Sequence, residues 1–161
     1  METSAKNLGL ETFMQVVRNA PLISIDLLVY NQDNEILLGW RKNEPARDCW
    51  FVPGGRILKD ETIRSAFTRI VLAETGLHLT TEQADFHGLY EHFYPDANFA
   101  GEPGFGTHYV VLAFEIKLSS HEPTLPREQH VRYCWMHIDT LLDDPQVNQF
   151  VKNYFNGTET W

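Results

Sequence analysis

Hydrophobic and polar residues alternate along two segments of the chain, and this alternation predicts β-strands. In residues 22–30, Ser24 and Asp26 point to one face, and the opposite face is aliphatic: Ile23, Ile25, Leu27 and Val29. Residues 107–118 alternate in the same way over a longer run. Shorter strands are predicted at residues 35–41, 50–52, 85–94 and 132–138.

Apolar residues at helical spacing predict three helices, at residues 8–19, from about 60 to 75, and at 146–155. The middle helix is expected to begin at Asp60 as its N-cap and to end before Gly76 as its C′ residue. Helices that precede, interrupt and follow the strands predict an α/β fold. Its expected form is an α/β/α sandwich with a mixed β-sheet between the helices.

The segment 95–106 has the sequence PDANFAGEPGFG and separates two predicted strands. Two interpretations are open. The segment is either a long hairpin loop or a mobile lid, since loops of this length in compact domains are often functional. In a lid, Phe99 and Phe105 are its expected apolar contacts.

Composition and charge exclude several classes of protein. The 161 residues suit one domain, spanning 1–161, with one core. The net charge of −9 argues against nucleic-acid binding. No run approaches the roughly 18 apolar residues of a membrane span, and no secretory signal is recognised at the N-terminus. Cys49 and Cys134 lie far apart in sequence, which favours reduced thiols in a cytoplasmic protein.

The most informative segment runs from Gly55 to Leu77 and follows the sequence FVPG. It resembles the Nudix box, G-x5-E-x7-R-E-U-x-E-E-x-G-U, where U is a bulky apolar residue. Seven positions fit the box: Gly55, Glu61, Arg69, Val71, Glu74, Gly76 and Leu77. The resemblance implies the Nudix α/β/α sandwich.

Two positions depart from the box, because Ile70 and Ala73 stand where it has glutamates. Each departure removes an expected metal ligand or base, and Glu74 is the glutamate that remains of this group. A cluster of several metal ions that directs attack at phosphorus is therefore poorly supported. Glu61 and Arg69 lie two helical turns apart, which favours a structural ion pair.

A closer resemblance covers about residues 11–155. Five segments and the departures Ile70 and Ala73 are similar to the GDP-mannose mannosyl hydrolase subfamily. The segments are PLISIDLLVYNQDNEILLGWRKNEPA, WFVPGGRILKDET, HFYPDANF, THYVVLAFEI and REQHVRYCWM. The likeness is weaker at residues 100–106 and at both ends.

This resemblance implies hydrolysis of GDP-mannose, with GDP-glucose as a further candidate substrate, by inverting attack of water at the anomeric carbon. It implies one Mg²⁺ per subunit, for which Mn²⁺ can substitute, and a homodimer. The metal ligands it implies are Gly54 through its carbonyl, Glu74 and Gln129. The implied general base is His130, the implied diphosphate ligands are Arg41 and Arg56, and the implied residues near the sugar are Asp26, His92 and Tyr109. Of these, His130, Arg41, Arg56, Asp26 and Tyr109 are expected to act in catalysis.

Elementary chemistry agrees with this scheme. A cation and two arginines can stabilise the GDP leaving group, so that the reaction needs only a base on the opposite face of the sugar. A histidine with an ordinary pKa of about 6.5 suits that role.

Other interpretations of the same residues are open. From composition alone, His130 is usually interpreted as a solvated loop residue. Arg41 is alternatively a surface charge, and His92 and Tyr109 are alternatively core residues. The alternative functions are a Nudix pyrophosphohydrolase that cleaves at phosphorus, a non-enzymatic nucleotide-sugar sensor, and a purely structural domain. Ile70 and Ala73 argue against the first, and Glu74, Gln129 and His130 together argue against the second.

Overall fold

The computed structural model describes residues 8–119, 123, 125 and 130–158. Within them, seven strands form one sheet, in the order β3-β2-β1-β6-β5, with β4 paired to β1 and β7 paired to β2. The sheet is mixed, because β1 and β6 run parallel while the other ladders are antiparallel. The strands are β1 (Leu22–Tyr30), β2 (Ile36–Arg41), β3 (Trp50–Phe51), β4 (Gly54–Arg56), β5 (Asp85–Tyr94), β6 (Thr107–Lys117) and β7 (His130–Met136).

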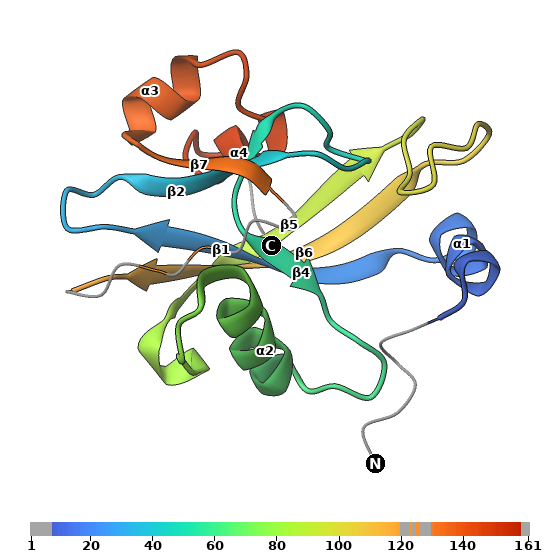
Figure 1. Ribbon diagram of the computed structural model, residues 1–161, viewed down its shortest axis with the longest axis horizontal. Coiled ribbons are helices and arrows are strands. Elements are labelled where there is room, and N and C mark those ends of the chain that lie inside the picture. Colours follow the sequence, from blue (N-terminus) through green and yellow to red (C-terminus); the bar gives the residue numbers. More distant parts are fainter. Residues whose placement is uncertain (1–7, 120–122, 124, 126–129, 159–161) are drawn as a thin grey trace.

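Helices lie on both sides of this sheet, as Figure 1 shows. They are α1 (Leu10–Asn19), α2 (Ile63–Thr75), α3 (Ile138–Asp143) and α4 (Gln149–Asn153), with a short 3-10 helix at Thr81–Gln83. Helix α2 covers one face, α3 and α4 cover the other, and α1 lies beside the end of the sheet where β1 begins (Figure 1). The predicted α/β/α sandwich with a mixed sheet is confirmed.

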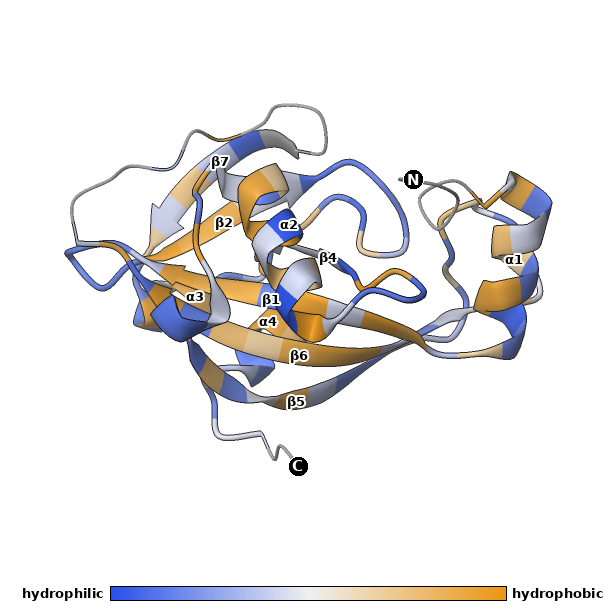
Figure 2. Ribbon diagram, turned by 90° about the horizontal axis from the view of Figure 1, so that it is seen from below, coloured by the Kyte–Doolittle hydropathy of each residue, from blue (hydrophilic) through white to orange (hydrophobic). Residues whose placement is uncertain are grey.

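The alternation along β1 divides the interior into two cores. Leu27 and Val29 pack with Phe67 of α2 on one face, whereas Leu28 packs with Leu141 of α3 on the other. Because both faces of the sheet are covered, β1 is buried over most of its length. Figure 2 shows the resulting concentration of hydrophobic residues along β1 and β6.

Helix α2 begins and ends at defined caps. Its N-cap is Thr62, whose hydroxyl accepts a hydrogen bond from the backbone N–H of Ser65 at 3.1 Å. The prediction of Asp60 as N-cap was wrong, because Asp60 adopts a φ of 65° in the turn before the helix. Gly76 ends the helix with a φ of 72°, as predicted.

The loop 95–106 joins β5 to β6, which pair antiparallel up to Tyr94 and Thr107. The segment is therefore a hairpin loop, while its movement as a lid stays a prediction. The loop is organised around the fully buried Asn98, whose side-chain amide donates to the carbonyls of Glu102 at 2.8 Å and Phe105 at 2.9 Å. Among the described residues, no helix is both long and apolar enough to span a bilayer.

Candidate active site

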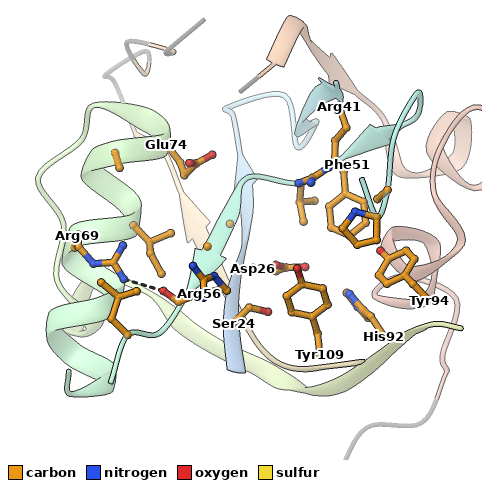
Figure 3. Close-up of a pocket in the computed structure, with 18 residues that line it drawn as sticks. Ser24, Asp26, Arg41, Phe51, Arg56, Arg69, Glu74, His92, Tyr94 and Tyr109 are labelled. Atoms are coloured by element: carbon orange, nitrogen blue, oxygen red, sulfur yellow. Dashed lines mark hydrogen bonds between the residues drawn. The ribbon is translucent and has the colours of Figure 1, made fainter. Parts of the chain in front are cut away.

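A pocket of about 350 Å³ opens between α2 and the sheet. Figure 3 shows its lining, in which side chains from the helix face side chains from the sheet across the β4 segment. The lining residues with polar or aromatic side chains are Ser24, Asp26, Arg41, Phe51, Arg56, Arg69, Glu74, His92, Tyr94 and Tyr109.

The two glycines of β4 allow this strand to lie close to its neighbours. A Cβ atom at Gly54 would lie 2.6 Å from both the Asp26 Oδ1 and the Ile25 carbonyl oxygen, and one at Gly55 would lie 3.2 Å from Ile70 Cγ1. Any larger residue at Gly54 would therefore displace β4 from β1.

Gly54 and Glu74 present oxygen atoms at one edge of β4. Because the neighbouring Pro53 carbonyl bonds to the N–H of Leu27 in β1, the backbone groups of Gly54 face the opposite edge. There the Gly54 N–H donates to the Glu74 carboxylate. The Gly54 carbonyl is on the same edge, so that both groups supply oxygen ligands of the kind a hard cation prefers.

The electrostatic setting of Glu74 also fits a cation. Glu74 is 4% exposed. Burial, and then the nearby Asp26, raise the pKa of Glu74 from 4.5 to about 7, although Arg41 opposes this shift. No group of three or more His, Cys, Asp or Glu side chains able to hold a metal occurs in the described part of the chain. Glu74 and the Gly54 carbonyl are thus the described oxygen groups at this edge of β4.

Asp26 lies on β1 at the floor of the pocket and is almost fully buried. Burial raises its pKa to about 7, while the hydrogen bond from Tyr154 and the charge of Arg41 oppose the shift. The Tyr154 hydroxyl donates to Asp26 Oδ2 at 2.5 Å and lies 3.1 Å from His92 Nε2. Sequence reasoning missed Tyr154, because 128 residues separate it from Asp26 and no local motif marks the contact.

His92 and Tyr109 are neighbours on β5 and β6, where they form a register pair, and both line the pocket. The His92 ring stacks on Phe150 with ring centroids 4.4 Å apart. Burial lowers the pKa of His92 from 6.5 to about 3, so the ring is neutral at physiological pH. Burial also raises the pKa of Tyr109 above its ordinary value. Both side chains are thus uncharged hydrogen-bonding groups at neutral pH.

Arg41 ends β2 and brings a positive charge between Asp26 and Glu74, since its charge lowers the pKa of both carboxyl groups. Its guanidinium lies 5.8 Å from the centre of the Phe51 ring. The Arg41 Nε is buried and has no hydrogen-bond partner within the described residues. An anionic ligand in the pocket would satisfy this donor.

Arg56 ends β4 and reaches the pocket from the opposite side. Its guanidinium carbon lies 4.0 Å from the centre of the Phe13 ring of α1. Phe13 in turn packs on Phe99 of the 95–106 loop, with ring centroids 4.5 Å apart. Burial lowers the pKa of Arg56 somewhat, but the group remains a cation at neutral pH. The helix and the loop together hold this arginine in place.

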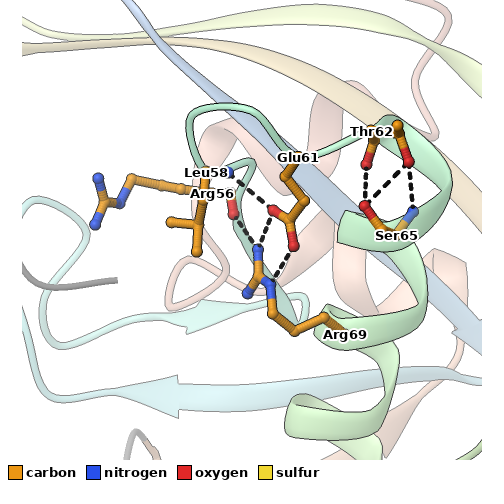
Figure 4. A network of polar contacts seen from close by, with 6 residues as sticks. All are labelled: Arg56, Leu58, Glu61, Thr62, Ser65 and Arg69. Atoms are coloured by element: carbon orange, nitrogen blue, oxygen red, sulfur yellow. Dashed lines mark hydrogen bonds and ion pairs between the residues drawn. The ribbon is translucent and has the colours of Figure 1, made fainter. Parts of the chain in front are cut away.

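Glu61 and Arg69 form the predicted ion pair, but Glu61 lies before the N-cap Thr62 and not on α2, so the helical spacing was not its basis. Arg69 Nε donates to Glu61 Oε1 at 2.6 Å and its NH2 group donates to Glu61 Oε2 at 2.8 Å. Figure 4 shows that Arg69 also donates to the carbonyl of Arg56, and that Glu61 accepts from the N–H of Leu58. This network joins the loop after β4 to the middle of α2.

The structure describes only part of the segment that holds the predicted residues Gln129 and His130. Gln129 lies outside the described residues. The backbone of His130 begins β7 and is the register partner of Arg41. Position 130 is therefore adjacent to a residue that lines the pocket.

Comparison with known proteins relates the chain to one family and several of its members. Residues 20–155 match the NUDIX domain family. The chain is 42% identical over 103 residues to the low-salt glycan biosynthesis protein Agl8 of Haloferax volcanii, which covers 64% of this chain and 63% of that relative. It is 40% identical over 57 residues to an ADP-ribose pyrophosphatase of Methanocaldococcus jannaschii, and this match covers 35% of this chain and 33% of that relative. The matches thus span less than two thirds of these curated relatives.

Among solved structures, the chain is similar to the MutT NUDIX hydrolase of Burkholderia pseudomallei. The TM-score is 0.66, the sequence identity is 25%, and the match covers 84% of this chain and 96% of that one. The shared fold agrees with the mixed sheet between helices described above.

Proposed function

The chain belongs to the Nudix family, and we propose that it hydrolyses GDP-mannose to GDP and free mannose. Water attacks the anomeric carbon of the sugar with inversion of configuration, and GDP-glucose is a further candidate substrate. The observation that carries this proposal is the chemistry of α2 at the pocket. Four α2 residues of the Nudix box region line it, namely Arg69, Ile70, Ala73 and Glu74, and Glu74 is the one carboxylic acid among them.

Attack at phosphorus in a pocket of this kind would require groups that activate water beside the diphosphate. Such sites commonly hold two metal ions, which align the attacking and leaving oxygens. Ile70 is 1% exposed and packs in the core, so α2 supplies one carboxylate where the Nudix box supplies a group of them. The single-carboxylate site favours stabilisation of a leaving diphosphate over activation of a nucleophile.

The leaving group is stabilised by positive charge on both sides of the pocket. The Gly54 carbonyl, Glu74 and Gln129 would hold Mg²⁺, which would supply positive charge to the diphosphate. Arg41 and Arg56 supply two further cations, and the free Nε of Arg41 is a donor ready for a phosphate oxygen. With the charge neutralised, GDP leaves without a protonated carboxylic acid.

The sugar is held on the sheet side of the pocket. Asp26 accepts hydrogen bonds from sugar hydroxyls, and the neutral His92 and Tyr109 offer further partners. His130 acts as the general base that removes a proton from the attacking water, as in inverting glycoside hydrolysis. Its place beside Arg41 in the sheet supports this role.

The proposed partners are the nucleotide sugar and a second copy of the chain in a homodimer. The free thiols of Cys49 and Cys134 are compatible with the reducing cytoplasm, where we propose that the chain acts.

A pyrophosphohydrolase is the second candidate function. The similarity to an ADP-ribose pyrophosphatase over 57 residues favours it. In that case the products of GDP-mannose would be GMP and mannose 1-phosphate, released by attack at phosphorus.

Product analysis with two proteins tests the proposal. The wild-type chain with GDP-mannose and Mg²⁺ should release GDP and mannose. His130→Gln should lower kcat by about 10²–10⁴-fold, the range for loss of a general base, with GDP and Mg²⁺ affinity nearly unchanged. GMP and mannose 1-phosphate as the main products would overturn the proposal. Reduced metal affinity of His130→Gln with little change in kcat would remove His130 as the base.

A further inference from the structure

We infer that Tyr154 is a positioning residue for the reaction, and that it orients Asp26 toward the sugar through a hydrogen-bond chain that begins at His92. The inference rests on the proposed function in one respect, because Asp26 and His92 are the residues proposed to hold the sugar. Tyr154 itself is absent from the pocket lining and lies behind these two residues.

The direction of each hydrogen bond in this chain follows from counting protons. A tyrosine hydroxyl carries one proton, and Tyr154 uses it to donate a hydrogen bond to Asp26 Oδ2 at 2.5 Å. The Tyr154 oxygen is then an acceptor toward His92 Nε2, 3.1 Å away. His92 must therefore carry its hydrogen on Nε2, which leaves Nδ1 as the acceptor available to a ligand hydroxyl.

The hydrogen-bond chain determines which oxygen of Asp26 is left for the ligand. Tyr154 occupies Oδ2, so Oδ1, which faces the Gly54 segment of β4, is the remaining acceptor. A carboxylate held through one oxygen cannot rotate freely about its terminal bond. The hydrogen bond also favours the ionised form of Asp26 against the effect of burial.

Tyr154 is itself held rigidly. It is 4% exposed and its ring meets the Tyr90 ring edge-on at 4.6 Å between centroids. The Tyr154 carbonyl lies 2.9 Å from His87 Nε2 of β5. The turn after α4 is thereby fixed to the sheet, and the hydroxyl has a defined position from which to donate.

The matched pair of variants is Tyr154→Phe and Tyr90→Phe. Both remove one hydroxyl from the same aromatic cluster, but Tyr90 is outside the pocket lining and outside the hydrogen-bond chain. Tyr154→Phe should lower kcat by about 10–100-fold, the usual cost of losing such a supporting hydrogen bond, with KM for GDP-mannose and Mg²⁺ affinity changed less. Tyr90→Phe should retain kcat within about 2-fold, since it leaves the hydrogen-bond chain from His92 to Asp26 intact.

A double-mutant cycle with Asp26→Asn separates positioning from a general structural role. If Tyr154 acts through Asp26, Tyr154→Phe should add less than about 3-fold to the defect of Asp26→Asn, because the effects of coupled residues do not add. Equal effects of Tyr154→Phe on kcat in both backgrounds would overturn the inference, as would equal losses in Tyr154→Phe and Tyr90→Phe.

The tautomer of His92 gives a readout that needs neither substrate nor a variant at position 154. Long-range ¹H–¹⁵N NMR of the wild-type protein, with His92 assigned by His92→Gln, should show the Nε2–H tautomer. An Nδ1–H tautomer would overturn the inference even if GDP-mannose is hydrolysed as proposed. If the wild type instead produces GMP, the proposed function fails, and the cycle is run on that reaction to decide the role of Tyr154.

Discussion

Replacing Ile70 with glutamate restores a carboxylate of the Nudix box, and we predict that it destabilises the protein without redirecting its chemistry. Ile70 is 1% exposed and packs between the β4 glycines and the core beneath α2. Loss of the buried isoleucine costs about 1.5–3 kcal/mol, and burial of a poorly paired polar group costs about 1–3 kcal/mol more. The new carboxyl would also lie one turn from Glu74, whose ionisation burial already disfavours.

The combined effect of Ile70→Glu is thus about 2.5–6 kcal/mol, which corresponds to a decrease in Tm of roughly 5–24 °C for a chain of this size. Calorimetry in excess chelator measures it, with Ile70→Met as the control of similar volume, for which the cost should be below about 1.5 kcal/mol. Added Mg²⁺ should recover part of the loss, because a cation stabilises two adjacent carboxylates. An unchanged Tm, together with GMP release at a rate near that of native GDP release, would refute the reasoning.

Three further predictions follow from the charges around the pocket. Glu74→Gln should lower Mg²⁺ affinity by more than about 10-fold and slow turnover, whereas full wild-type activity in excess chelator would contradict the cation site. Phe13→Leu removes the ring beneath Arg56 and should weaken GDP binding by about 2–5-fold in calorimetric titration. Phe105→Leu should not, because the Phe105 ring lies beneath Arg18, which is outside the pocket lining. Burial raises the pKa of Asp26 from 3.8 to about 7. The stability that Asp26 contributes to the metal-free fold is therefore fully present below about pH 4 and is lost as the pH rises through 7. Urea unfolding of Asp26→Asn should therefore show a flatter dependence on pH over this range than the wild type, and parallel curves would contradict the shift.

The elements with a clear hydrophobic period were predictable from the sequence. The strands β1 and β6 follow from strict alternation, and the end of α2 follows from Gly76. Strand β4 was not predicted, because its three residues Gly54–Arg56 carry no apolar pattern and pair through their backbone. Helix α3 was missed because six residues are too few to display a helical period.

The candidate site was predictable where local motifs exist and not where distant segments meet. The Nudix box and the segments around it led to Asp26, Arg41, Arg56, Glu74 and His92, which the fold brings to one pocket. The contacts of Tyr154 with Asp26 and of Phe13 with Arg56 join residues far apart in the chain. Such contacts depend on how α4 and α1 pack against the sheet, which no periodicity encodes.

The bond that water breaks is the centre of the account, and isotope labelling reports it directly. Hydrolysis of GDP-mannose in H₂¹⁸O, followed by mass spectrometry of both products, identifies the atom that water attacks. Attack at the anomeric carbon places ¹⁸O in mannose and leaves GDP unlabelled, which is the result that we predict. Label in GDP, or in GMP or mannose 1-phosphate, would show attack at phosphorus and contradict the account.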